Sequence, residues 1–241
     1  MFAGHLLSGV METVERHAAQ RWWADGERTV AGLVTRLTNE QFAEPSALPD
    51  WSRAHVVAHL ARNADALVNL LDWARTGVET PMYPSRAARD AGIASTAAAP
   101  PDDLRTDFAA ARAGLAETIS AMPAEAWSAT VRNGQGKPVT AAEVPWMRAK
   151  ELWVHGTDLR AGLAFADLPV GFCVALVDDV LGLFAGRDQM PDVRISATDV
   201  DRTWGSGPRP VEGPVPAIAA WLTRSDASGL GGDVPPPPAW L

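Results

Sequence analysis

The chain has 241 residues, enough to bury a sizeable core in one large domain or two smaller ones. Its 21 basic and 29 acidic residues give a net charge of -8, with no basic cluster, which argues against nucleic acid and anionic membrane surfaces as partners. The single cysteine, Cys173, lies in an apolar run and can form no intramolecular disulfide, as expected of a cytoplasmic protein.

No signal peptide or membrane span is expected. The N-terminus lacks a basic segment followed by a long apolar one. The longest apolar stretch, near 170–186, is interrupted by Asp178 and Asp179 and is too short to span a bilayer.

Residues 1–165 are predicted to form a four-helix bundle, because apolar residues recur there at helical spacing. The first helix is expected at about 8–38. The second begins at Ser52, a favourable N-cap, and ends at Gly77, a favourable C-terminal stop. A loop of small residues bounded by prolines follows, at about 78–100.

The third helix is expected at about 102–121 and the fourth after a turn-rich segment at 132–138. Thr140 and Glu143 match a capping box at the start of the fourth helix. This helix is expected to end near Gly162.

In residues 166–241 the long helical patterns give way to one more helical segment, short β-like segments and a Gly/Pro-rich stretch. This change predicts a small α/β domain packed on the bundle. The overall fold class is therefore a helical bundle followed by a small α/β domain. In order, the second domain is expected to contain a helix at about 170–185, strands at Val193–Ala197 and Arg202–Trp204, a Gly/Pro-rich stretch at 205–216 and a short helix at Ala217–Thr223.

Two pairs of possible metal ligands stand out on the second and fourth helices. His55 and His59 are four residues apart, as are Glu151 and His155, so each pair lies on one side of its helix. Imidazoles and a carboxylate suit zinc, and three protein ligands leave a coordination position free for chemistry. His59 and Glu151 both fall on apolar faces, where a shared ion would offset the cost of burying them.

A less specific interpretation remains open at this point. Glu151 and His155 can simply share a hydrogen bond while His59 faces a bound water. His55 is a fourth ligand, a residue that supports a ligand, or part of the helix surface, and Asp158 can orient an imidazole. His5 and His17 have no partner at ligand spacing and are expected at the surface.

Arg224 follows a short apolar helix and is either a surface charge or an anion-binding residue. The chain has no His-Glu-x-x-His, no Gly-x-Ser-x-Gly and no phosphate-binding glycine loop, which argues against peptidase, α/β-hydrolase and nucleotide-driven chemistry.

Three segments resemble the mycothiol-dependent maleylpyruvate isomerases, within the DinB-like superfamily of metal-binding four-helix bundles. They are Leu48–Leu60, Glu79–Tyr83 and Trp146–His155, and the likeness extends over almost the full length to the tail at Pro235–Leu241. The resemblance implies a DinB-like bundle with a sterol-carrier-like C-terminal domain.

The resemblance also implies a site. His59, Glu151 and His155 would be the three metal ligands, most commonly of Zn²⁺, and His55 would lie outside this set. Arg224 would be the arginine needed for activity, although related chains often carry a glycine before it that is absent here. Mycothiol would be the second cofactor, and the partners would be this low-molecular-weight thiol and a small dicarboxylate substrate, bound by a monomer.

The implied reaction is the cis–trans isomerisation of maleylpyruvate to fumarylpyruvate in gentisate breakdown. The metal-activated thiolate adds to the C=C bond, the bond rotates, and elimination regenerates the thiol. Two alternatives are a mycothiol S-transferase that releases the adduct and a non-catalytic metal-binding or sensing module.

Overall fold

The computed structural model describes residues 3–232 and 234–240, and side chains from His17 onward. The chain divides into two compact units, Met1–Gly162 and Leu163–Leu241. The first is helical and the second combines helices with a small sheet, which confirms the predicted fold class. The predicted domain boundary, between residues 165 and 166, falls in the short helix η4 (Phe165–Asp167) near the start of the second unit.

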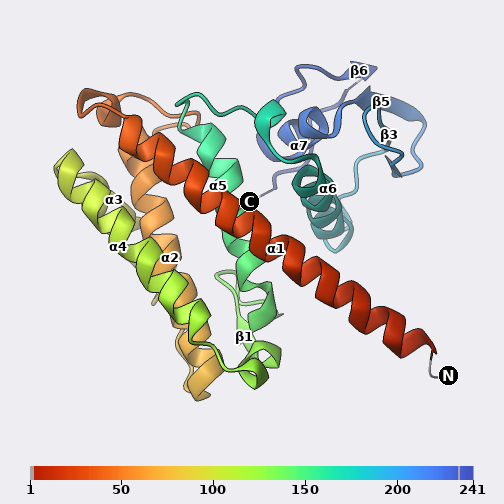
Figure 1. Ribbon diagram of the computed structural model, residues 1–241. Coiled ribbons are helices and arrows are strands. Elements are labelled where there is room, and N and C mark those ends of the chain that lie inside the picture. The colour runs from red at the N-terminus through yellow and green to blue at the C-terminus, as the bar shows by residue number, and fades with distance from the viewer. Residues whose placement is uncertain (1–2, 233, 241) are drawn as a thin grey trace. The chain divides into compact units, whose positions relative to one another are not determined.

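Five α-helices build the first unit (Figure 1). α2 is central, since it packs against α3, α4 and α5, while α1 packs mainly along α5. The four predicted helices are confirmed with small shifts at their ends. The helices are α1 (Ala3–Arg36), α2 (Arg53–Thr76), α3 (Arg86–Ala97), α4 (Pro101–Ser120) and α5 (Val144–Asp158).

The ends of α2 follow from the local sequence. Ser52 is the N-cap, in an extended conformation, and its backbone N–H donates to Nδ1 of His55 at 3.3 Å. Gly77 ends the helix in the left-handed conformation, at φ 73°, which costs glycine nothing because it has no Cβ. Between these ends, thirteen residues of α2 are buried, so the helix forms the core of the unit.

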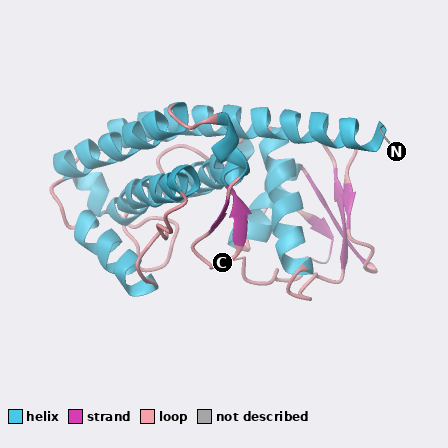
Figure 2. Ribbon diagram, turned by 90° about the horizontal axis from the view of Figure 1, so that it is seen from below, coloured by secondary structure: helices cyan, strands magenta, loops and turns pink. Residues whose placement is uncertain are grey.

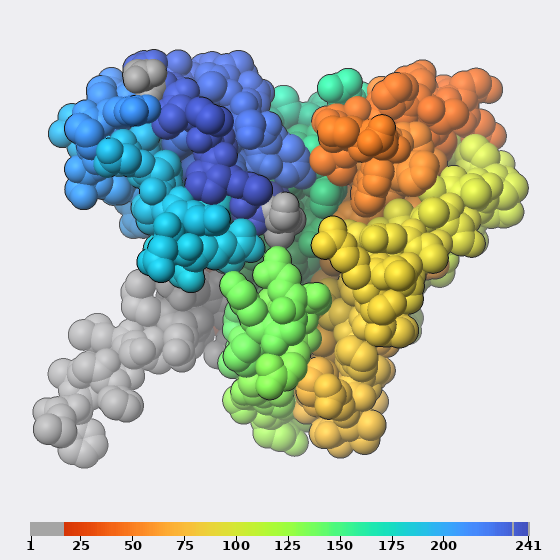
Figure 3. All heavy atoms as spheres, turned by 180° about the vertical axis from the view of Figure 1, so that it is seen from behind, coloured from red at the N-terminus to blue at the C-terminus, as the bar shows by residue number. Residues whose placement is uncertain are grey.

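The prediction of a loop at 78–100 was wrong for its second half, which forms the helix α3. Ser85 caps this helix by accepting from the backbone N–H of Ala88 at 3.0 Å. Ile93 is the one fully buried side chain of α3, so the helix has almost no apolar stripe to reveal it in the sequence. Figure 3 shows the helix at the surface of the first unit, within the yellow region.

The segment before α5 also contains structure that the sequence did not indicate. Strands β1 (Thr130–Arg132) and β2 (Pro138–Thr140) pair antiparallel around the expected turn. The Glu143 side chain accepts from the backbone N–H of Thr140 at 2.9 Å, which confirms the capping box. A 3-10 turn, η3 (Ala141–Glu143), comes before α5, and the α-helix ends at Asp158 instead of Gly162.

The second unit packs α6 (Val170–Ala185) against α7 (Val215–Arg224) beside a four-stranded sheet of order β4-β3-β5-β6. Figure 2 shows these short strands in magenta. The predicted strand at Val193–Ala197 is β3, and it pairs antiparallel with β4 (Thr203–Trp204).

Two strands of this sheet were missed, because one lies in the Gly/Pro-rich stretch expected to be irregular and the other consists of two glycines. β5 (Arg209–Gly213) is parallel to β3 and antiparallel to β6 (Gly231–Gly232). Cys173 is buried in α6, and this burial raises the pKa of its thiol to about 12. Among the described residues, no helix has the length and apolar character needed to cross a membrane.

Candidate metal centre

Three side chains from two neighbouring helices converge inside the first unit. His59 comes from α2, and Glu151 and His155 come from successive turns of α5. Oε2 of Glu151 lies 2.8 Å from Nε2 of His59 and 3.3 Å from Nε2 of His155. One nitrogen or oxygen from each residue lies within 4.8 Å of the others, so a single ion can contact all three.

The cluster is enclosed on one side and open on the other. His59 is only 3% exposed, and its ring meets the His155 ring edge-on with centroids 4.6 Å apart. The Glu151 side chain is 28% exposed, so solvent or a small ligand reaches the cluster on the carboxylate side.

Each group has its pKa moved from the ordinary value. Burial would raise the pKa of Glu151, but attraction to His59 in its protonated form and hydrogen bonds from both histidines hold it well below the usual range. Burial lowers the pKa of His59. Burial also opposes protonation of His155, but hydrogen bonds to Asp158 and Glu151 prevail and raise its pKa. A metal at His155 therefore competes with a proton.

Asp158 orients His155 from the last turn of α5. Its Oδ2 lies 2.7 Å from Nδ1 of His155, and the residue is 1% exposed. A buried carboxylate keeps the proton on Nδ1, which leaves the Nε2 lone pair free for an ion. The predicted orienting role of Asp158 thus has the required geometry.

Two imidazole nitrogens and a carboxylate oxygen form a donor set that zinc accepts. Tetrahedral zinc with bonds of about 2.0–2.1 Å places its ligand atoms about 3.3 Å apart. The separations of 2.8 and 3.3 Å from Glu151 are close to this spacing, so small side-chain movements suffice. The residues therefore fit a divalent ion with at least one open position.

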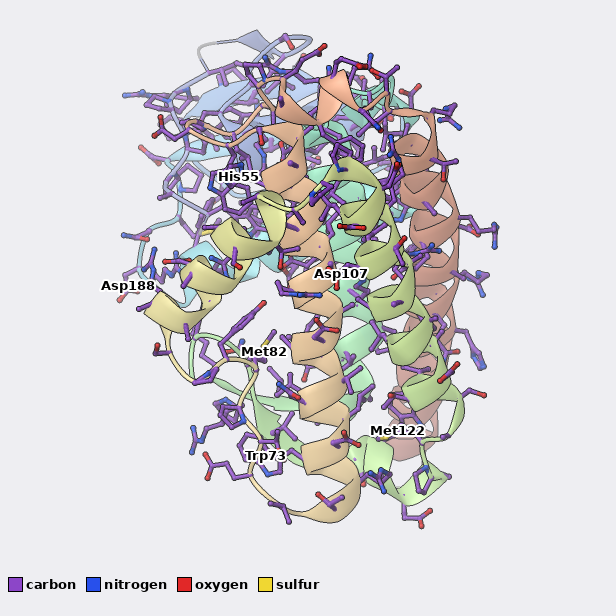
Figure 4. All side chains as sticks on the ribbon, turned by 90° about the vertical axis from the view of Figure 1, so that its left-hand side faces the viewer. His55, Trp73, Met82, Asp107, Met122 and Asp188 are labelled. Atoms are coloured by element: carbon purple, nitrogen blue, oxygen red, sulfur yellow. The ribbon has the colours of Figure 1, made fainter. Side chains whose placement is uncertain are left out.

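His55 does not join the cluster. Its Nδ1 lies 2.8 Å from Oγ of Ser52 and accepts the Ser52 backbone N–H, so it takes the part that Glu or Gln plays in a capping box. The ring also packs against Trp51, with centroids 6.1 Å apart. In Figure 4, His55 lies at the end of α2 opposite to Trp73. Of the alternatives for His55, the geometry supports a role in the helix end.

Three residues beside the cluster had no role in the sequence analysis. The Trp51 ring lies 5.7 Å from the His59 ring, centroid to centroid. Arg89, on α3, places Nη2 3.4 Å from Nδ1 of His59 and its guanidinium 5.9 Å from the centre of the Tyr83 ring. Burial and the charge of Glu151 raise the pKa of Tyr83 to about 12, so it stays a neutral phenol.

The contact with Arg89 fixes the tautomer of His59. Arginine can only donate, so Nδ1 of His59 is the acceptor and Nε2 carries the proton that it donates to Glu151. An ion on Nε2 requires the proton to be on Nδ1 instead, and two donors would then face each other. Metal binding at His59 therefore means that Arg89 gives up this contact. No sequence signal indicated this, because α3 was not predicted.

Arg224 lies at the end of α7 in the second unit. Its guanidinium lies 5.6 Å from the centre of the Trp240 ring, and Nη1 donates to the Thr223 carbonyl at 2.7 Å. The side chain is half-buried, so Arg224 is not the freely solvated surface charge of one interpretation. His17 is exposed, as predicted, whereas His5 lies outside the described side chains.

Residues 23–160 match the family model of the mycothiol maleylpyruvate isomerase N-terminal domain. The crystal structure of a mycothiol-dependent maleylpyruvate isomerase is similar at a TM-score of 0.89 and 30% identity, over 93% of this chain and 97% of that one. A mutant of such an isomerase gives a TM-score of 0.88, also at 30% identity and with the same coverage of both chains.

Uncharacterized proteins from two strains of Mycobacterium tuberculosis are 31% identical over 140 residues, covering 54% of this chain. The matched region covers 51% of each of these curated relatives, so the chain spans about half of their length. The family match covers more than half of the present chain and includes all three clustered residues. The chain belongs to the mycothiol maleylpyruvate isomerase family.

Proposed function

We propose that this protein is a metal- and mycothiol-dependent cis–trans isomerase that converts maleylpyruvate to fumarylpyruvate, a step of gentisate breakdown. The observation that carries the proposal is the cluster of His59, Glu151 and His155 in a chain of this family. We assign these three residues as ligands of a divalent ion, Zn²⁺. The match of 93% of the chain to the crystal structure of such an isomerase supports the same reaction.

The residues around the cluster suit the proposed chemistry. A zinc ion held there would lower the pKa of a coordinated thiol, so that mycothiol reacts as its thiolate at neutral pH. Glu151 contributes a full negative charge to the ligand set, and Asp158 holds His155 in the tautomer that binds an ion. Arg89 brings a cation next to His59, where a guanidinium can hold a substrate carboxylate by paired hydrogen bonds.

The decisive experiment measures two quantities on one sample: zinc content, and turnover of maleylpyruvate with and without mycothiol. The proposal expects about one ion per chain and fumarylpyruvate formation only when the thiol is present. Consumption of thiol with other electrophiles, without isomerisation, would instead support an S-transferase. Metal without any thiol-dependent reaction would support a binding module.

Asp158→Asn tests how far the metal depends on the orientation of His155. Asparagine keeps the size of the side chain but loses the charge that holds the proton on Nδ1 of His155. We expect zinc to bind about 10–100-fold more weakly, since residues that support metal ligands have effects of this size. Competition with a chromophoric chelator measures the change, and an unaltered affinity would contradict the role of Asp158.

Arg224→Ala tests the proposed catalytic arginine. We expect thiol-dependent turnover to fall at least about a hundredfold, as on losing a group that stabilises developing negative charge, with zinc affinity unchanged. Arg194→Ala is the matched control, because Arg194 is an exposed arginine of the same unit. Steady-state kinetics with both variants decides, and equal activities would remove Arg224 from the site.

We also propose that the protein acts as a cytoplasmic monomer. The buried, unpaired Cys173 suits a reducing compartment. Sedimentation of the purified chain tests the oligomeric state.

A further inference from the structure

A second polar cluster lies inside the helical unit, apart from the proposed ligands. Its centre is Arg148 of α5, whose side chain is completely buried. Nε of Arg148 donates to Glu27 of α1 at 2.9 Å. Nη1 donates to the Leu60 carbonyl at 2.7 Å and to Oδ1 of Asn63 at 2.9 Å, both on α2.

This cluster is the layer directly adjoining the ligands. Arg148 comes three residues before Glu151, and Asn63 comes four residues after His59, so each lies about one turn from a ligand on the same side of its helix. Leu60, whose carbonyl Arg148 binds, is the residue next to His59. One guanidinium therefore joins the two helices that carry all three ligands.

Stability alone does not account for an arginine at this position. Burying a guanidinium is costly, and replacing a buried ion pair by apolar residues of similar size is often neutral or stabilising. Nη2 of Arg148 is buried without a hydrogen-bond partner among the described residues, which adds to the cost. An apolar side chain makes no directional bonds. The forked donors of arginine do, and they fix the position of α2 along α5.

We propose that Arg148 is a positioning residue for the metal centre: it sets the register of α2 against α5, and thereby the distance from His59 to Glu151 and His155. This inference rests on the proposed function, because it needs these residues to bind an ion. A zinc site tolerates only small errors in the distances between its ligand atoms. The ligand atoms of a zinc site must lie within a few tenths of an ångström of their places, whereas apolar side chains pack acceptably over a wider range of helix offsets.

The experiment separates positioning from packing with the double variant Glu27→Leu/Arg148→Met, which removes both charges and keeps apolar bulk. Zinc affinity is measured by chelator competition, and the absorption spectrum of the Co²⁺-loaded protein reports ligand geometry. We expect a folded variant that binds zinc about 10–100-fold more weakly, as on loss of support for a ligand, with an altered cobalt spectrum.

Arg112→Met is the matched control. Arg112 also binds Glu27, through its Nε, but it lies on α4, and neither its bonds to Glu27 nor its ring contact with Phe108 involves a ligand helix. Its removal is expected to leave zinc affinity and the cobalt spectrum unchanged. A loss equal to that of the double variant would mean that any damage to the cluster has the same effect, and would overturn the inference.

Arg148→Lys covers the case in which the double variant does not fold, because lysine keeps the charge beside Glu27 but not the planar fork. Weaker zinc binding by about tenfold is expected of this folded variant. Wild-type zinc affinity and cobalt spectrum in either folded variant would overturn the inference while leaving the metal centre intact. Absence of zinc binding by the wild-type protein would refute the metal centre, and the inference with it.

Discussion

The His59→Ala substitution is expected to abolish zinc binding and to lower thiol-dependent turnover at least about a thousandfold. The reason is that a Lewis acid stabilises the transition state of such reactions by several kcal/mol. Removing one of three ligands leaves Glu151 and His155, which cannot by themselves hold the ion in an enclosed site. The metal-free bundle should keep its fold, since the leucines around His59 remain packed. Zinc content, turnover and far-UV circular dichroism of the same sample measure these effects.

His55→Ala is the matched control, a second histidine one turn earlier on α2. It should keep zinc and turnover but lower the free energy of unfolding by about 1 kcal/mol, because the Ser52 backbone N–H loses the acceptor that caps the helix. Urea denaturation of the metal-free protein measures that cost. Loss of zinc in the His55 variant would make His55 a ligand, whereas unfolding of the His59 variant would indicate a structural ion.

The candidate ligands could be picked out from the sequence because their signals are local, whereas the meeting of His59 with Glu151, 92 residues away, was implied only by the family resemblance. His59 and Glu151 are ionisable groups on apolar helix faces, and His155 and Asp158 follow Glu151 at helical spacing. Spacing also placed Ser52 and Gly77 at the ends of α2. Spacing did not decide between the possible roles of His55. Capping and metal binding both use a ring nitrogen and differ only in the direction in which the imidazole points.

The features that were missed depend on contacts distant in the chain. α3 is short, rich in alanine and buries only Ile93, so the segment was interpreted as a loop of small residues, and the contact between Arg89 and His59 was missed with it. β5 lies among glycines and prolines, and its pairing with β3 overrides their weak strand propensity. Likewise, nothing local to Arg148 shows that its partner is Glu27, 121 residues away.

Glu27→Leu alone is expected to lower the free energy of unfolding by about 3–5 kcal/mol, because it leaves the buried guanidinium of Arg148 without its anion. Burial would raise the pKa of Glu27, but the charge and hydrogen bonds of Arg148 and Arg112 lower it, so the carboxylate is the ionised partner of both arginines. Urea denaturation of the metal-free protein, with the slope compared between variants, measures the loss.

Adding Arg148→Met to this variant should restore most of the lost stability, since no buried charge then lacks a partner. Arg112→Met, in contrast, should cost no more than about 1 kcal/mol, because that side chain is 25% exposed and water can take the place of a lost partner. If the double variant proves less stable than Glu27→Leu alone, the arginine stabilises the bundle by itself. A double variant that regains stability but not zinc affinity would show that the buried pair serves the metal centre and contributes little to stability.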